Sequence, residues 1–163
     1  MTMVRRALIT TDPGPRKAAT ISLLLWGLLH VLGGLSVMFS AADPATGLAS
    51  LASAAPSGSI PTDPGPIVVA VLGFHGFNLA MAGIAVTLIT LKRTWRRWPE
   101  GVAIGLVVAG VADAGLIIFL LAPGHMPLAE GLWGPALLAV ALVAVMVPSR
   151  SAAESKTASV AVT

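Results

Sequence analysis

Ionisable side chains that could exchange a proton lie within the most apolar stretches of this chain. These residues are His30, His75 and Asp113. An acidic side chain at the centre of a hydrocarbon layer costs about 2.5–3.5 kcal/mol on the insertion scale, so such residues face other protein groups and usually serve a function. A histidine and a carboxylate held together away from water can act as general acid and base. We therefore predict that His30, His75 and Asp113 are catalytic.

Residue counting places these three side chains at a similar depth. Each lies roughly 20–25 Å from the nearest cluster of basic residues along the chain, at about 1.5 Å of helix rise per residue. Three helices that carry ionisable groups at one level predict a shared polar pocket between the bilayer midplane and the outer leaflet. The same three side chains would be the ligands of a metal ion, if one is bound, because histidine and aspartate suit iron or zinc.

Two aromatic residues and one amide belong to the same layer. Trp26 precedes His30 by four residues and Asn78 follows His75 by three, so each pair shares a helix face. Trp133 begins the last apolar stretch at the same depth. We predict that Trp26, Asn78 and Trp133 contact the substrate.

Four stretches of the chain are long enough and apolar enough to position these groups in a membrane. A membrane-spanning helix needs about 20 mostly apolar residues, and none of the stretches alternates as a barrel strand must. The predicted spans are about residues 18–39, 67–91, 101–122 and 132–147. They form a transmembrane domain over 18–148, with an outer loop at 40–66, a cytoplasmic segment at 1–17 and a disordered cytoplasmic tail at 149–163.

The composition excludes several other classes of protein. Only 10% of the residues are charged and 56% are hydrophobic, whereas a soluble domain is about 25% charged. A net charge of +3 next to apolar runs points to a lipid bilayer as partner and excludes nucleic acid. The chain has no cysteine, which excludes disulfides and thiolate metal sites.

The basic residues predict the orientation of the spans. All ten precede the first span, lie between the second and third, or follow the fourth: Arg5, Arg6, Arg16, Lys17, Lys92, Arg93, Arg96, Arg97, Arg150 and Lys156. Because positive residues are enriched on the cytoplasmic side, both termini are expected in the cytoplasm. The predicted fold is therefore an all-α, antiparallel up-down bundle of four helices in the cell membrane.

These features favour acid–base chemistry on, or binding of, a lipophilic small molecule without a cofactor. Isomerisation, cyclisation or hydration by proton transfer fits the residue types. A metal ion or haem bound within the membrane is the alternative, and a proton-coupled transporter subunit or a structural membrane subunit is a further one. Whether the chain is an enzyme stays open at this point. A bundle of four spans is narrow, which also leaves a homo-oligomer open.

Overall fold

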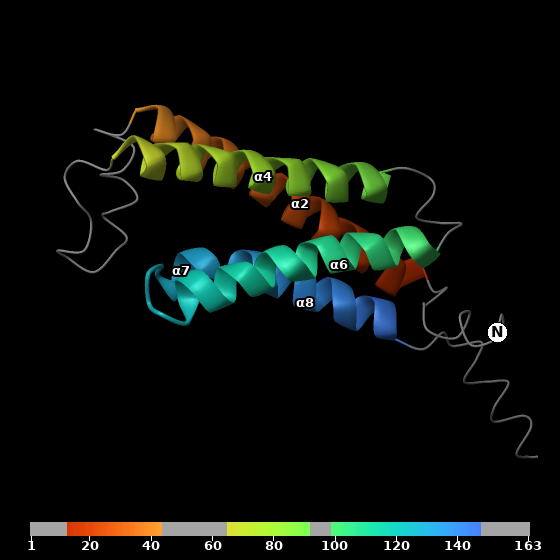
Figure 1. Cartoon of the computed structure of the whole chain (residues 1–163). Helices are drawn as coiled ribbons and strands as arrows, with labels where there is room; N and C mark the ends of the chain where they lie inside the picture. The colour runs from red at the N-terminus through yellow and green to blue at the C-terminus, as the bar shows by residue number, and fades with distance from the viewer. Residues whose placement is uncertain (1–12, 44–64, 92–98, 148–163) are drawn as a thin grey trace, which may run out of the picture.

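The computed structural model describes residues 13–43, 65–91 and 99–147, in which every regular element is a helix (Figure 1). The elements are α2 (Pro13–Ala42), α4 (Pro66–Leu91), α6 (Pro99–Leu116), the π-helix η1 (Ile117–Leu121), α7 (Leu128–Gly131) and α8 (Trp133–Met146). The predicted all-helical class is confirmed for these residues, which contain no strand. Most of the cytoplasmic segment 1–17, most of the outer loop 40–66 and the whole tail 149–163 lie outside the described residues.

Three of the helical stretches are long enough and apolar enough to cross a membrane. They are Gly14–Ala42, Pro66–Leu91 and Ala103–Leu121. The long helices α2, α4 and α6 each begin at a proline, whose fixed φ and missing N–H suit the first position of a helix. These lengths and compositions indicate a multi-pass membrane protein.

The fourth predicted span, about 132–147, is found as a shorter helix with a helical extension. Helix α8 has only 14 residues, but α7 precedes it directly. The backbone N–H of Leu132 donates to Leu128, and the N–H of Ala136 donates to Leu132, so the helical path continues through the junction. At about 1.5 Å per residue, residues 128–146 rise about 28 Å, close to the thickness of the hydrocarbon core.

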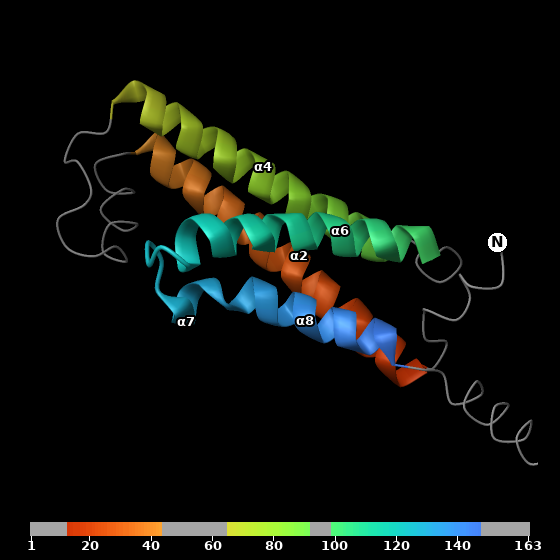
Figure 2. The same ribbon diagram turned by 60° about the horizontal axis from the view of Figure 1, so that its bottom comes forward.

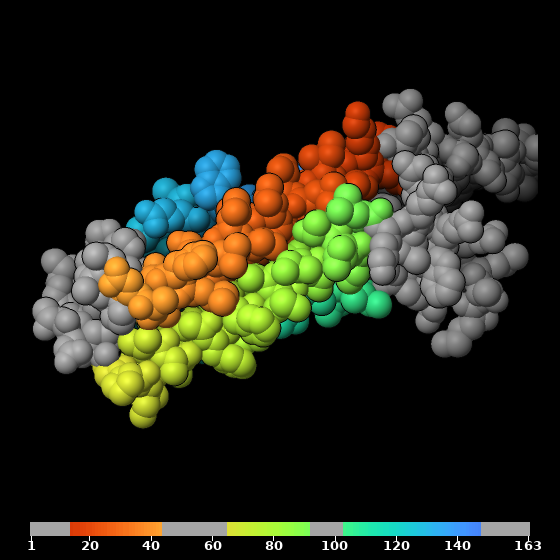
Figure 3. Space-filling view, turned by 90° about the horizontal axis from the view of Figure 1, so that it is seen from above, coloured from red at the N-terminus to blue at the C-terminus, as the bar shows by residue number. Residues whose placement is uncertain are grey.

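The closest packing of helices is between α2 and α4, which lie side by side along their length (Figure 3). A Cβ atom on Gly34 would lie 2.5 Å from the carbonyl oxygen of Gly76, and it would also overlap the backbone of Ala80. A Cβ atom on Gly83 would lie 2.5 Å from the carbonyl oxygen of Gly27. Small residues allow the backbones of membrane helices to touch in this way.

Helix α8 packs against another side of α2, and α6 packs against α4 and α8 (Figure 2). The buried core is shared by α2, α4, α6 and α8 and consists of small and branched side chains around one tryptophan: Ala19, Leu23, Trp26, Val86, Ala109, Leu138, Ala141, Ala144 and Val145. Large apolar side chains are exposed on α2, α4, α6 and α8. An apolar surface of this extent requires a hydrophobic surrounding, which agrees with a position in lipid.

Candidate functional site

Three of the six predicted site residues lie together where α2 meets α6. Trp26 is fully buried, while His30 is 7% exposed and Asp113 is 2% exposed. The indole N–H of Trp26 donates a hydrogen bond of 3.0 Å to Oδ2 of Asp113. Nε2 of His30 lies 3.6 Å from Oδ1 of Asp113. We call these two ionisable residues the His30–Asp113 pair.

The spacing of Trp26 and His30 on α2 sets the orientation of the imidazole. Residues four apart share a helix face, and here the two rings stack with their centroids 3.6 Å apart and their planes at 19°. Nδ1 of His30 lies 2.9 Å from the backbone oxygen of Trp26. Because a carbonyl oxygen can only accept, Nδ1 carries a hydrogen and donates it. Nε2 is therefore the nitrogen that faces Asp113.

Within the His30–Asp113 pair, a ring nitrogen of the imidazole faces an oxygen of the carboxyl group. With Nδ1 protonated, a neutral imidazole presents a lone pair at Nε2, and an ionised carboxylate would present another at Oδ1. Two facing lone pairs repel, and a hydrogen on either atom would remove this repulsion. Among the described residues, Oδ1 of Asp113 has no hydrogen-bond partner. At 3.6 Å the two atoms are in contact but beyond hydrogen-bond length.

Gly134 of α8 covers the His30–Asp113 pair. A Cβ atom at this position would lie 2.8 Å from Oδ1 of Asp113 and 3.1 Å from Cε1 of His30. Only glycine allows the backbone of α8 to approach this closely. The reasoning from sequence missed Gly134 and selected its neighbour Trp133, whose side chain is 64% exposed and does not join the pair.

The other two predicted site residues, His75 and Asn78, are exposed on α4. His75 does not join the His30–Asp113 pair as a third metal ligand, because no three histidine or acidic side chains among the described residues are grouped to hold a metal ion. The physical reason is the rotation of α4. Gly76 faces α2 with its backbone in contact, and adjacent residues of a helix point about 100° apart, so His75 points to one side of this contact and is exposed.

A π-helical turn follows Asp113 on the same helical stretch. The backbone N–H of Ala122 donates to the oxygen of Ile117, five residues earlier. Leu121, at the end of this turn, is buried against α7, where a Cβ atom on Gly131 would overlap its side chain. Such turns are uncommon and frequently occur near functional sites.

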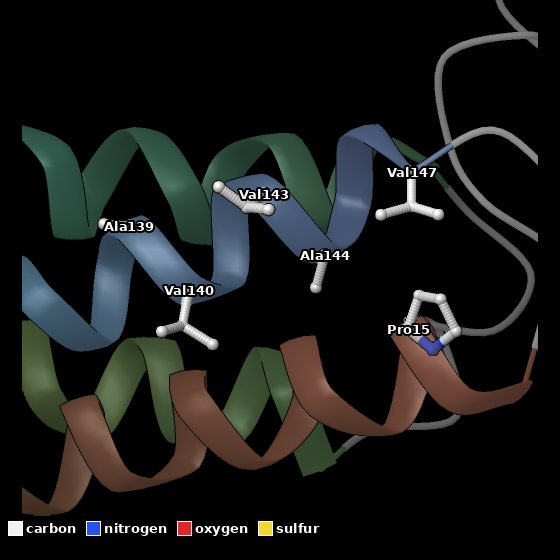
Figure 4. Close-up of a pocket in the computed structure, with 6 residues that line it drawn as sticks. All are labelled: Pro15, Ala139, Val140, Val143, Ala144 and Val147. Carbon is white, nitrogen blue, oxygen red and sulfur yellow. The ribbon is translucent and has the colours of Figure 1, made fainter.

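An open groove lies at the other end of α8, beside the start of α2 (Figure 4). Its volume is about 410 Å³. Its lining residues are Pro15, Ala139, Val140, Val143, Ala144 and Val147. None of these carries an ionisable group, so this groove offers no acid–base chemistry.

The chemistry of the site has to be inferred from its own residues. No family model matches the chain, and neither a curated protein nor a solved structure is similar to it. Of the six predicted site residues, the structure brings together Trp26, His30 and Asp113. These three side chains, with Gly134 packed over them, set what the site can do.

Proposed function

We propose that this membrane protein performs acid–base chemistry on a lipophilic small molecule, using the proton of the His30–Asp113 pair. The observation that carries the proposal is the carboxyl group of Asp113. It is 2% exposed, and its Oδ1 has no hydrogen bond to the described residues while facing Nε2 of His30 at 3.6 Å. Buried polar atoms are usually satisfied in proteins, so an unsatisfied carboxyl oxygen beside an imidazole nitrogen favours a reactive role over a purely structural one.

The partners of the two residues suit proton exchange. Trp26 donates to Oδ2 of Asp113, which leaves Oδ1 as the oxygen that gains or loses the proton. The hydrogen bond from Nδ1 leaves Nε2 of His30 as the exchanging nitrogen. One group can give a proton to the substrate while the other takes a proton from it. The protons then balance in an isomerisation or cyclisation, and no cofactor is required.

The face of α2 that carries His30 is open on its next turn. Gly33 follows His30 by three residues, so it shares this face, and nothing lies within 4 Å of the position its Cβ would occupy. A molecule that approaches here must first dissolve among the apolar side chains that cover the helices. This supports a lipophilic substrate.

Hydrogen exchange into lipid-soluble molecules tests the proposed chemistry. The protein in lipid nanodiscs is incubated in deuterated buffer with an organic extract of the host membranes, and the extract is examined by mass spectrometry. We expect the wild-type protein to incorporate deuterium into at least one component. Asp113→Asn should slow this incorporation at least about 100-fold, because general acid–base groups contribute about 10²–10⁴-fold.

His75→Gln is the matched control, since it removes an intramembrane histidine that lies outside the pair. It should exchange deuterium as fast as the wild type, and both variants should keep the wild-type melting temperature in detergent. If Asp113→Asn melts higher and exchanges deuterium unchanged, the carboxyl group serves only packing and the proposed function is wrong.

We infer further that the four helical spans form an antiparallel up-down bundle with both termini in the cytoplasm. Two observations support this. Gly34 contacts Gly76 while Gly27 contacts Gly83, the pairing expected for α2 and α4 running in opposite directions. All ten basic residues fall on the side of the predicted spans that carries the termini, as the excess of positive charge in the cytoplasm requires.

Single cysteines test this orientation, because the chain contains no cysteine of its own. In intact cells, a membrane-impermeant thiol reagent should label Ser57→Cys, in the predicted outer loop, and should leave Ser155→Cys, in the predicted tail, unlabelled. Both variants should react once the membrane is permeabilised, which controls for reactivity. Labelling of Ser155→Cys in intact cells would contradict a cytoplasmic C-terminus.

A further inference from the structure

His75 and Asn78 form a polar site on the outer surface of α4 that the proposed function does not use. The two residues are three apart, so they share one face of the helix. Both side chains are exposed, and neither makes a hydrogen bond to another described residue. Both lie within a helix that is apolar and long enough to span a membrane. Polar side chains that face hydrocarbon are costly, so these two require a partner.

The two residues belong to a longer stripe on α4. Its members are separated alternately by three and four residues, the spacing by which two helices pack along a seam. The stripe consists of Val68, Val71, His75, Asn78, Ala82, Ala85 and Ile89. We call it the α4 stripe.

Among the residues that the structure describes, only one end of the α4 stripe is covered by another helix. At that end Ile89 packs beside Gly105 of α6, with 3.9 Å between its Cγ2 and the position of a Cβ on the glycine. Helices α4 and α6 then diverge toward the beginning of α4 (Figures 1 and 2). Val68 is 49% exposed and Val71 is 59% exposed. The uncovered end therefore continues an existing helix–helix interface and carries the two polar residues.

We propose that the uncovered end of the α4 stripe is a dimer interface between two copies of this chain. The two α4 helices would pack about a twofold axis along the membrane normal, with His75 and Asn78 forming hydrogen bonds across it. Imidazole and carboxamide each contain a donor and an acceptor, so an identical copy supplies the complementary group to each. An asparagine in such a stripe also sets the register of two packed helices. The proposal does not depend on the His30–Asp113 pair.

Disulfide cross-linking of the protein in its membrane tests the dimer, because an introduced cysteine is the only thiol in the chain. Val71→Cys lies on the α4 stripe and should give a disulfide-linked dimer on mild oxidation. Phe77→Cys is the matched control on another face of α4, where the wild-type side chain is also about half exposed, at 49%, and it should stay monomeric. The proposal is overturned if Val71→Cys stays monomeric, if both variants cross-link equally, or if Val71→Cys links only to a different protein.

Replacing the polar side chains tests what holds the two copies together. In a mild detergent, Asn78→Leu and His75→Leu should each raise the dissociation constant of the dimer on the order of tenfold, since each change removes two symmetric hydrogen bonds. Phe77→Leu should leave the dissociation constant unchanged. Sedimentation equilibrium provides the measurement. If the wild-type protein is a monomer, and its His75 and Asn78 variants instead lose a bound lipophilic molecule, the α4 stripe binds a ligand and the dimer is wrong.

Discussion

Gly34→Ala is expected to lower the free energy of unfolding by at least about 2 kcal/mol. The added methyl group would lie 2.5 Å from the backbone oxygen of Gly76, and it would overlap the backbone of Ala80. Backbone atoms of a packed helix cannot rotate aside as a flexible side chain can, so α2 and α4 would have to separate along their shared interface. Overpacking of this kind costs about 1–3 kcal/mol or more. Thermal unfolding in detergent measures the loss.

The adjacent residue, Gly33, supplies a control at the same depth in the same helix. Nothing lies within 4 Å of the position of its Cβ, so Gly33→Ala makes no clash. In a helix, alanine is favoured over glycine by about 1 kcal/mol, and the variant should melt at or above the wild-type temperature. Equal destabilisation by Gly33→Ala and Gly34→Ala would contradict the backbone contact between α2 and α4.

The second large effect concerns the His30–Asp113 pair. His30→Leu is expected to destabilise the protein by about 3–5 kcal/mol, because it leaves the carboxyl group of Asp113 buried with only the indole of Trp26 as partner. Asp113→Leu is expected to cost about 1–3 kcal/mol, because the N–H of Trp26 then lacks its acceptor. Leucine has the same branching and the same number of side-chain heavy atoms as aspartate but cannot accept a hydrogen bond.

The double variant shows whether the two residues act as one unit. Replacing both members of a buried polar pair by apolar side chains is often neutral or stabilising, so His30→Leu with Asp113→Leu should be more stable than His30→Leu alone. Unfolding of the wild type, both single variants and the double variant in the same detergent gives the coupling. Strictly additive losses would mean that the pair, although in contact, shares no proton and no interaction energy.

Much of the fold follows from the lengths of the apolar runs. The predicted spans 67–91 and 101–122 coincide with α4 and with α6 plus η1 to within two residues at each end. The prediction began the first helix at residue 18, but α2 begins at Pro13, because basic residues can join a helix while their charges reach the membrane surface. Hydropathy reports where a helix meets hydrocarbon and does not report where it ends.

The depth of the site residues in the membrane was predictable from the sequence, but the rotation of each helix about its axis was not. Counting residues along the helices placed His30, His75 and Asp113 at one depth in the membrane. The rotation of α4 about its own axis is set instead by two contacts, which no hydrophobic pattern in the sequence reveals. These are the approaches of Gly76 and Gly83 to the backbone of α2. Apolar residues occur on every side of α4, so periodicity could not single out the buried side and could not show that His75 is exposed.

The π turn at η1 also decides how one stretch of helix meets two others. In a regular α-helix, the eight residues from Asp113 to Leu121 would turn about 80° beyond two full revolutions. The π turn contains one additional residue. The side chain of Leu121 therefore points in almost the same direction from the helix axis as that of Asp113. Both side chains then meet the same neighbouring segment, Asp113 at Gly134 and Leu121 at Gly131. The additional residue brings Asp113 and Leu121 to the same side of the helix, so that both contacts can form. The number of residues between Asp113 and Leu121 is therefore as important for these contacts as the two residue types.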